Sequence, residues 1–283
     1  MIGILATIMV VRKIRPTRWP FKLEDRLLRG PGESLQRERS RLLEQLMFEF
    51  FGGIIAVLVL CGLALTLASV FEFNWGEGIL AIFLVCAGVT MISGMRIVAL
   101  WRKLQAYHLG WFGERIVAEK LAPLRFSGWR VFHDVPFTSN GREFNIDHVV
   151  LGEGGLYVIE TKARRKGGGR KLEPDDVVTF DGKALHWPRY ANDESGLRQA
   201  ELNAETLSKW LMDEIGEQVS AIPLLVIPGW TVKFTWSDQR RLCRVESANW
   251  LQNKFKDLPA ILSSKTVDLV NRRLLAKCRD VEE

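Results

Sequence analysis

The sequence predicts an α/β sandwich that is preceded by a pair of membrane-spanning helices. Two long runs, residues 50–71 and 79–95, contain no charged residue. After residue 109, helical and strand-like hydrophobic patterns alternate along the chain. The expected order there is a helix, three strands, an inserted hairpin, a helix, a strand and closing helices, which is typical of a sheet flanked by helices.

The two apolar runs are interpreted as a transmembrane hairpin over residues 49–101. A helix needs roughly 20 apolar residues to cross a bilayer. Residues 50–71 meet this length and are too long and uniform for a buried helix of a soluble protein. Residues 79–95 are shorter, but Arg96 can extend its side chain to the interface, and Trp75 and Trp101 flank the run as interface anchors would.

Charge asymmetry predicts the orientation of this hairpin. Lys and Arg residues are dense between residues 12 and 41 and recur at 102–103, whereas the linker 72–78 carries two Glu and no basic residue. The positive-inside rule then places both termini in the cytoplasm of a multi-pass protein of a bacterial-type inner (plasma) membrane. Residues 1–11 are too short for a span and are expected to be interfacial or disordered.

Composition excludes several other classes. Residues 1–103 hold 13 basic and 8 acidic residues, so they carry +5 of the net charge of +6. The high pI therefore reports topology and is not evidence for nucleic-acid binding. The four Cys form no CxxC pair and the four His show no ligand spacing, which argues against a disulfide framework and a zinc site. A transporter is disfavoured because the two runs contain no acid–base pair.

A strand–turn–strand pattern, "NIDHVVLGEGGLYVIETK", carries the most informative charges. If Leu151 pairs with Leu156 across the turn, paired residue numbers sum to 307, and Asp147 faces Glu160. Two facing carboxylates repel each other, and a divalent cation between them would reverse that penalty. The pattern therefore predicts a metal site, and the alternative is an ordinary solvated strand end.

The same register places Asn145 opposite Lys162, on one face with the two carboxylates. His148 alternates to the opposite face and is interpreted as a structural histidine. The remaining elements follow from periodicity and turn signals. They are a helix at 110–123, a strand at 128–137, a hairpin at 177–187 around Asp181–Gly182, a helix at 196–215, a strand at 222–228, and helices at 246–255 and 267–278.

These motifs resemble the NERD, or nuclease-related, domain. The resemblance rests on "GWFGERIVAEKL", "FNIDHVVLGEGGLYVIETKA", the small hairpin and the "RQA" helix, and it covers about residues 108–230. It implies a restriction-endonuclease-like fold of the PD-(D/E)XK superfamily, a mixed sheet flanked by helices. The expected division is a basic cytoplasmic segment at 1–48, transmembrane helices at 49–101, a NERD-like domain at 104–235 and a helical extension at 236–283.

The resemblance also implies roles for individual residues. Asp147, Glu160 and Lys162 match the D…ExK triad, Glu114 matches the glutamate of the first helix, and Gln199 matches the glutamine of the later helix. The alternative for Glu114 is an exposed helix glutamate, and Gln199 is expected to position other groups.

In this scheme Mg²⁺ or Mn²⁺ is held by oxygen ligands and polarises the scissile phosphate, while Lys162 orients the attacking water or stabilises developing charge. One departure from the family pattern is Ala163, where a polar residue is common. The expected metal ligands are Asp147, Glu160, the Thr161 carbonyl and Glu114.

A basic cluster follows the triad, in the segment "ARRKGGGRK". It suits phosphates of nucleic acid or lipid head groups, and a solvated loop is the third interpretation. The expected function is a membrane-anchored, metal-dependent nuclease that acts on DNA, and the alternative is a non-catalytic nucleic-acid- or protein-binding module tethered to the membrane. The cluster residues are Arg164, Arg165, Lys166, Arg170 and Lys171.

Overall fold

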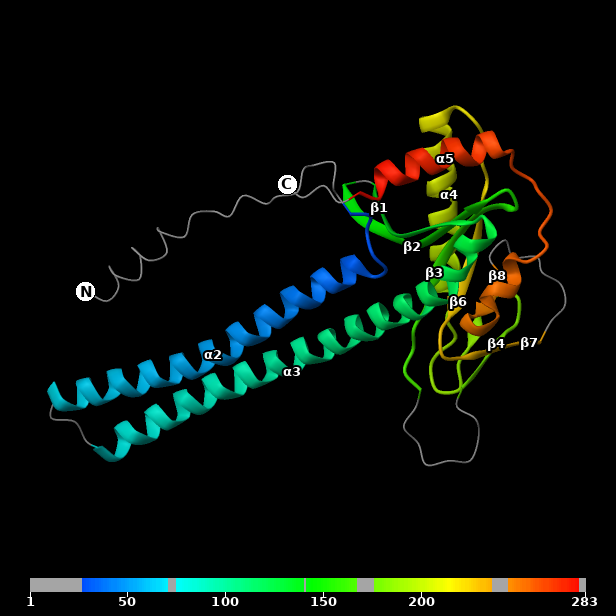
Figure 1. The fold of residues 1–283 in the computed structure, drawn as a ribbon. Helices are drawn as coiled ribbons and strands as arrows, with labels where there is room; N and C mark the ends of the chain where they lie inside the picture. Colours follow the sequence, from blue (N-terminus) through cyan, green and yellow to red (C-terminus); the bar gives the residue numbers. More distant parts are fainter. Residues whose placement is uncertain (1–26, 71–74, 140, 167–175, 236–243, 280–283) are drawn as a thin grey trace, which may run out of the picture.

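The computed structural model describes residues 27–70, 75–139, 141–166, 176–235 and 244–279. Two long helices, α2 (Glu33–Val70) and α3 (Trp75–Leu121), lie side by side and project away from an α/β domain (Figure 1). The helix predicted at 110–123 is not separate, because α3 runs as one helix of 47 residues into the domain. No proline occurs within α3, and the short helix η2 (Ala122–Ser127), which contains Pro123, follows it directly.

The two long helices agree with the predicted membrane pair in length and composition. Segments Glu33–Leu67 and Gly78–Ser127 are long and apolar enough to cross a membrane. The rest of the molecule buries none of the most apolar window of the first and 6% of that of the second, so they do not resemble core helices. The basic residues before residue 27 and linker residues 72–74 lie outside the described part of the chain.

A five-stranded mixed sheet forms the centre of the domain, in the order β1-β2-β3-β6-β8. Strands β1 (Arg130–Ser139), β2 (Arg142–Gly152) and β3 (Gly155–Thr161) are antiparallel, and β6 (Ala221–Ile227) and β8 (Arg244–Ser247) continue the sheet in parallel. The predicted small hairpin is confirmed as β4 (Val177–Phe180) and β5 (Leu185–His186), which join β7 (Thr231–Phe234) in a second sheet.

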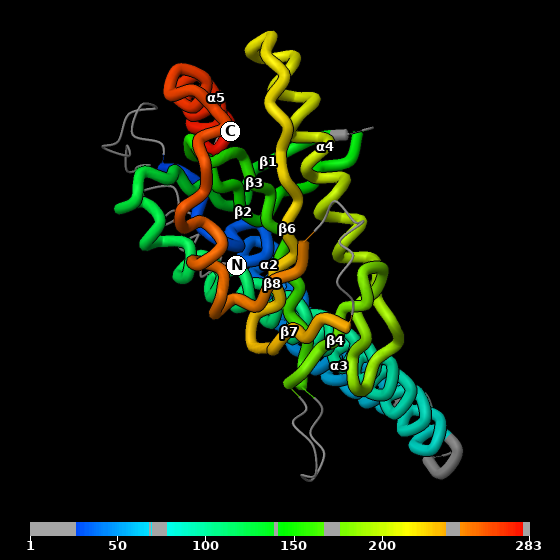
Figure 2. Tube along the Cα trace, turned by 90° about the vertical axis from the view of Figure 1, so that its right-hand side faces the viewer, coloured from blue at the N-terminus to red at the C-terminus, as the bar shows by residue number. Residues whose placement is uncertain are grey.

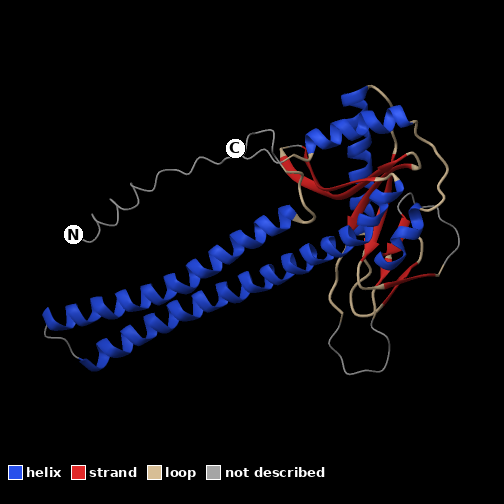
Figure 3. Ribbon diagram, in the orientation of Figure 1, coloured by secondary structure: helices blue, strands red, loops and turns tan. Residues whose placement is uncertain are grey.

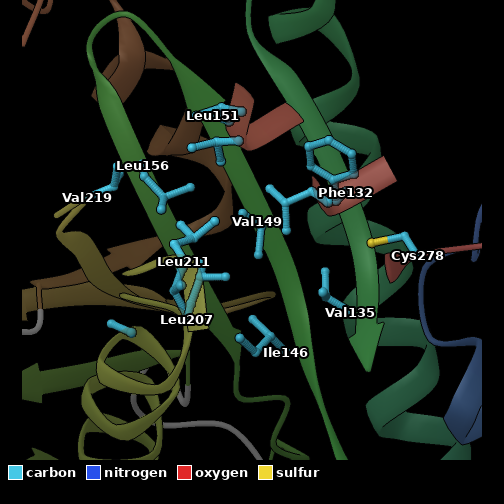
Figure 4. Close-up of a cluster of buried hydrophobic side chains, with 14 of the residues drawn as sticks. Phe132, Val135, Ile146, Val149, Leu151, Leu156, Leu207, Leu211, Val219 and Cys278 are labelled. Atoms are coloured by element: carbon cyan, nitrogen blue, oxygen red, sulfur yellow. The ribbon is translucent and has the colours of Figure 1, made fainter. Parts of the chain in front are cut away.

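Helices cover both faces of the main sheet (Figures 2 and 3). On one face, α4 (Ser195–Ile215) and α5 (Ser264–Lys277) enclose a core that contains Val149, Leu156 and Leu207 (Figure 4). On the other face, the end of α3 and the 3₁₀ segment η3 (Ala248–Phe255) enclose a second core. The predicted mixed sheet flanked by helices is therefore confirmed.

The prediction for residues 246–255 was wrong in part. This segment completes strand β8 and then forms η3 rather than an α-helix. Strands β7 and β8 were not predicted from the sequence, because each has only four residues and takes its hydrogen bonds from distant strands.

The segment before α2 is tied to the sheet by hydrogen bonds. We call residues 29–34 the strap. Its first residue, Arg29, donates its backbone N–H to the Cys278 carbonyl at 3.0 Å and its guanidinium to the Asp134 carboxylate of β1 at 3.1 Å. Its last residue, Ser34, donates its backbone N–H to the same carboxylate at 3.2 Å. The start of α2 is thereby fixed against β1, next to the predicted site.

Candidate active site

The predicted register of the central hairpin is confirmed. Strands β2 and β3 pair from Gly152–Gly155 to His148–Ile159, and each of these pairs sums to 307. The ladder ends there, one position before Asp147 and Glu160. Instead of a ladder bond, Asp147 Oδ2 accepts the backbone N–H of Thr161 at 2.7 Å. Both carboxylates therefore lie where the two strands separate.

The predicted pairing of Asn145 with Lys162 is wrong. Asn145 pairs with Pro136 of β1, and its Oδ1 accepts from Arg29 at 3.3 Å. The backbone N–H of Lys162 donates to the Val226 carbonyl at 2.9 Å, so the end of β3 follows β6 rather than β2.

Side-chain alternation in β1 and β2 is interrupted next to the site. Ile146 and Val149 are three residues apart and yet belong to one core, as do Phe132 and Val135 (Figure 4). Strict alternation would put the members of each pair on opposite faces. The interruption coincides with Asp134, which has a φ of 49° and no partner in the β1–β2 ladder. The prediction of one shared face for Asn145 through Lys162 therefore holds only in part.

Glu160 faces α4, where a buried asparagine holds it. Asn203 Nδ2 donates to Glu160 Oε2 at 3.0 Å, and Asn203 Oδ1 accepts from Gln199 Nε2 at 3.3 Å. Asn203 is 1% exposed on the apolar face of the helix. Gln199 therefore reaches the site through Asn203, and its positioning role stays a prediction.

Lys162 is held at the start of α4. Its Nζ donates to Ser195 Oγ at 3.3 Å, and Ser195 donates its backbone N–H to Asp193 Oδ1 at 2.9 Å. Asp193 also forms an ion pair with Arg164, whose guanidinium lies 5.0 Å from the centre of the Trp187 ring. A chain of contacts thus connects the lysine to Arg164 through two residues that were not predicted as site residues.

Glu114 approaches from α3 and is buried by the strap. It is 6% exposed, which rules out the exposed-glutamate interpretation, and its Oε2 has no hydrogen-bond partner. A Cβ on Gly32 would lie 3.5 Å from this oxygen and 2.9 Å from the Trp111 ring. Gly32 has a φ of 69°, so glycine serves both the backbone conformation and the close approach.

Burial changes the protonation of all three carboxylates. It raises the pKa of Glu114 to about 10, with the carboxylates of Asp147, Asp134 and Glu160 contributing. Burial raises the pKa of Asp147 to about 7 against the opposing effect of the Thr161 N–H. Burial and the Asp147 charge raise the pKa of Glu160 well above its ordinary value. Each carboxylate makes ionisation of the others more costly.

Comparison with known proteins places this arrangement in a family. The sequence model of the NERD family, described as a nuclease-related domain, matches residues 109–228. These residues form a NERD domain. Neither the curated proteins nor the solved structures gave a match to the chain. The matched region contains Glu114, both β-strand carboxylates, the lysine and the elements from η2 to β6 around them.

The departure at Ala163 has a packing explanation in this NERD domain. A Cβ on Gly113 of α3 would lie 2.7 Å from the Cβ of Ala163. The helix therefore passes so close to the end of β3 that a larger residue at either position would push the two elements apart.

The basic cluster of the NERD domain divides into residues with different surroundings. Arg164 forms an ion pair with Asp193, and its guanidinium also lies 5.1 Å from the centre of the Tyr190 ring. Its predicted role in nucleic-acid binding stays a prediction. Arg165 and Lys166 are exposed, and Arg165 contacts Gln105 of α3 at 3.4 Å. The predicted residues Arg170 and Lys171 lie outside the described residues.

His148 is structural, as predicted, and is fully buried. Its Nδ1 lies 2.8 Å from Nδ1 of His133, while its Nε2 has no partner. Burial lowers the pKa of both rings, that of His133 to about 4, so the pair is neutral at physiological pH.

The donor set suits a hard divalent cation. Within the described residues, no group of three His, Cys, Asp or Glu side chains is arranged to hold a metal ion. Asp147 and Glu160 nevertheless offer carboxylate oxygens, the ligands that Mg²⁺ and Mn²⁺ prefer, and Glu114 keeps a buried oxygen without a partner. The chemistry of these residues fits such an ion.

Sequence reasoning missed Asn203, Ser195, Asp193, Asp134 and Arg29. The spacing of Gln199 and Asn203, four residues apart on a predicted helix, was a usable signal that both face one way. The contacts of Asp134 and Arg29, which are 105 residues apart, left no local signal.

Proposed function

We propose that the chain is a membrane-anchored nuclease that hydrolyses phosphodiester bonds in DNA with the help of Mg²⁺ or Mn²⁺. The observation that carries the proposal is the convergence of Asp147, Glu160 and Lys162 at the separating ends of β2 and β3, inside a nuclease-related domain. Buried carboxylates without cationic partners are costly, which favours a functional reason for keeping them.

The residues of the site suit the steps of phosphodiester hydrolysis. When bound, a divalent cation supplies a Lewis acid for the phosphate and acidifies a water. Asp147 and Glu160 would hold the cation, with Glu114 and the Thr161 carbonyl as further ligands. Lys162 would orient the attacking water or stabilise the charge that develops on the phosphate.

Two residues would keep these groups in position. Asn203 fixes the Glu160 carboxylate by its hydrogen bond, and Ser195 fixes the Lys162 amine at the start of α4. Both carboxylates must lose their protons to bind a cation, so activity should rise with pH as they ionise.

The membrane hairpin supports a location for this activity. With α2 and α3 spanning the bilayer, the basic flanks favour a multi-pass protein of an inner (plasma) membrane, with both termini and the NERD domain in the cytoplasm. Protease added outside intact cells should spare the NERD domain, and its digestion under these conditions would reverse the topology.

DNA cleavage by the full chain in detergent tests the proposal. Wild type should cut DNA with Mg²⁺ or Mn²⁺ and not in EDTA. Asp147→Ala and Lys162→Ala should each lower the rate at least about 100-fold, the size of effect seen when one group that stabilises a transition state is removed. The matched controls Asp213→Ala and Lys209→Ala change exposed charges on α4 and should keep the rate. Equal rates for Asp147→Ala and Asp213→Ala would exclude the proposed site.

A non-catalytic binding module is the second candidate. It is favoured by the absence of a three-residue ligand group among the described residues and by the burial of Glu114. DNA that binds equally well with and without metal, and that is recovered uncut, would favour this candidate.

A further inference from the structure

A cleft of about 720 Å³ lies between the start of α2 and the last third of α3. One wall is the strap and the first turns of α2, and the other wall is α3. The cleft is lined from both sides by arginines, with an aromatic ring between them: Arg37, Ser40 and Arg41 from α2, and Trp111 and Arg115 from α3. A concave surface with guanidinium groups on two helices suits a polyanion.

The ring of Trp111, which lines the cleft, contacts a cation from each helix. Arg115, which also lines the cleft, lies 5.0 Å from the centre of the ring, and Arg39 of α2, which is not a lining residue, lies 4.5 Å from it. Trp111 is itself fixed by the close approach of Gly32. Stacking of this kind restrains long side chains, which lowers the entropy lost when they bind a ligand.

The acidic partners of these arginines do not prevent phosphate binding. Arg37 pairs with Glu33 and Arg41 pairs with Glu38, in both cases along the same helix. The arginine side chains are 49% and 73% exposed. The exposed Arg41–Glu38 pair contributes about 0–1 kcal/mol, so a phosphate can take the place of that carboxylate at little cost. Glu33 is 29% exposed, lines the cleft and also accepts the Gly30 N–H at 2.8 Å, so a phosphate would bind Arg37 beside this carboxylate.

The distance between the cleft and the membrane favours a soluble polyanion over lipid as the ligand. Glu49 and Arg96 form an ion pair at the end of the apolar runs, and we take this pair as the membrane boundary of the proposed hairpin. At about 1.5 Å of rise per residue, Arg37 lies about 18 Å beyond Glu49, and Arg115 lies about 28 Å beyond Arg96. A head-group layer is roughly 5–8 Å thick on each side of the hydrocarbon, so the cleft stands clear of it.

The cleft also adjoins the candidate active site. Arg115 follows Glu114 directly in α3, and Gly32 of the strap contacts both Glu114 and Trp111. We infer that the cleft binds the phosphate backbone of a nucleic acid and positions it along α2 and α3, so that the strand extends toward Asp147 and Glu160. The inference rests on the proposed function, because it names the surface by which that substrate is held.

Binding measured without cleavage tests the inference. The full chain in nanodiscs of zwitterionic lipid is titrated into a fluorescein-labelled DNA strand in EDTA, at about 50–200 mM salt. The cleft variant carries Arg37→Gln, Arg41→Gln and Arg115→Gln. The control variant carries the same net charge through Lys209→Gln, Arg272→Gln and Arg273→Gln, which lie on α4 and α5.

The cleft variant should bind about 10–100-fold more weakly, and its plot of log affinity against log salt should lose about 2–3 units of slope, because three phosphate contacts are removed. The control should match wild type, and both variants should melt like wild type. Equal losses in the two variants, or an unchanged slope in the cleft variant, would overturn the inference. The inference would also be overturned if the difference in DNA affinity between wild type and the cleft variant vanished on adding anionic lipid to the nanodiscs, because the arginines would then bind lipid head groups.

Cleavage data separate this inference from the proposed function. If wild type never cuts DNA but the cleft variant loses DNA binding, the proposed hydrolytic function fails and the inference that the cleft binds nucleic acid is supported. If wild type cuts DNA and the cleft variant binds and cuts equally well, the cleft fails and the hydrolytic proposal stands.

Discussion

Replacing Asp147 by Asn should remove a buried charge while keeping a hydrogen-bond acceptor for Thr161. In the wild type, Asp147 Oδ2 accepts the Thr161 N–H at 2.7 Å, and an asparagine Oδ1 can accept the same bond. The substitution therefore separates the cost of ionising this side chain from its structural role at the ends of β2 and β3.

The magnitude follows from the pKa of the carboxyl. An aspartate has a pKa of about 3.9 in an unfolded chain, and burial raises the pKa of Asp147 to about 7 in the folded protein. The folded state thus holds the proton more tightly, so the stabilisation is present below about pH 4 and is lost as pH rises through about 7. At 1.36 kcal/mol per pKa unit, the upper limit of the loss is about 4 kcal/mol.

The asparagine variant has no such loss, because it does not ionise. Its melting temperature in EDTA should rise relative to wild type between about pH 4 and 7 and then stay level. With roughly 2–4 °C for each kcal/mol in a domain of this size, the gain should reach at most about 8–16 °C. Thermal unfolding of the full chain in detergent, followed by tryptophan fluorescence, measures it. Asp213→Asn, on the exposed face of α4, is the matched control and should track wild type.

Divalent metal should narrow this difference between the two proteins. Metal at about 1,000 times its dissociation constant stabilises a folded protein by about 4.1 kcal/mol, which is about the upper limit of the loss, and the variant should gain much less because it lacks the ligand charge. A variant that melts below wild type by the same amount at every pH would refute the reasoning, since Asp147 would then act only as a hydrogen-bond acceptor.

Two further substitutions test the residues behind the site. Asn203→Leu removes the donor to the β3 carboxylate and should lower metal affinity or the cleavage rate about 10–100-fold, measured by calorimetry and by DNA cleavage. A loss of thermal stability with normal metal affinity would assign Asn203 to the core alone. Arg164→Ala breaks the ion pair with Asp193 and should cost about 2–3 kcal/mol of stability, whereas Arg165→Ala should cost little; equal melting temperatures for these two variants would contradict the structural role of Arg164.

The strand register was predictable because its causes are local. The turn "GEGG" sets the pairing of Leu151 with Leu156, and the apolar residues that follow on both strands fit only one register. The amphipathic helix α4 was predictable for the same reason, since its apolar spacing lies within the segment. Such features depend on residues within a few turns of one another.

The features that were not predictable depend on contacts between distant residues. The interrupted alternation at Asp134 accompanies the docking of Arg29 and Ser34, which lie 105 and 100 residues earlier in the chain. The continuation of α3 into the domain follows from its packing on Ala163 through Gly113. In both cases the preference of the local sequence is weak, and tertiary packing decides the outcome.

The buried carboxylates of the candidate site differ in their partners from the buried carboxylates elsewhere in the molecule. Asp134 is compensated by Arg29, and Asp193 is compensated by Arg164, so each of these carboxylates has a cation at bonding distance. In the described part of the chain, Asp147 and Glu160 have one uncharged donor each, and Glu114 has only the Gly32 backbone N–H close enough to lower its pKa.

The nearest lysine, Lys162, forms its hydrogen bond with a serine and not with one of these carboxylates. Lys162 donates to Ser195 at 3.3 Å, although it lies close enough to lower the pKa of both Asp147 and Glu160. Stability alone favours pairing a buried acid or replacing it by an apolar residue. A chain that pairs its other buried acids but leaves three together beside a lysine has the arrangement on which the proposed metal dependence rests, and the asparagine variant of Asp147 measures how much such a cation would contribute.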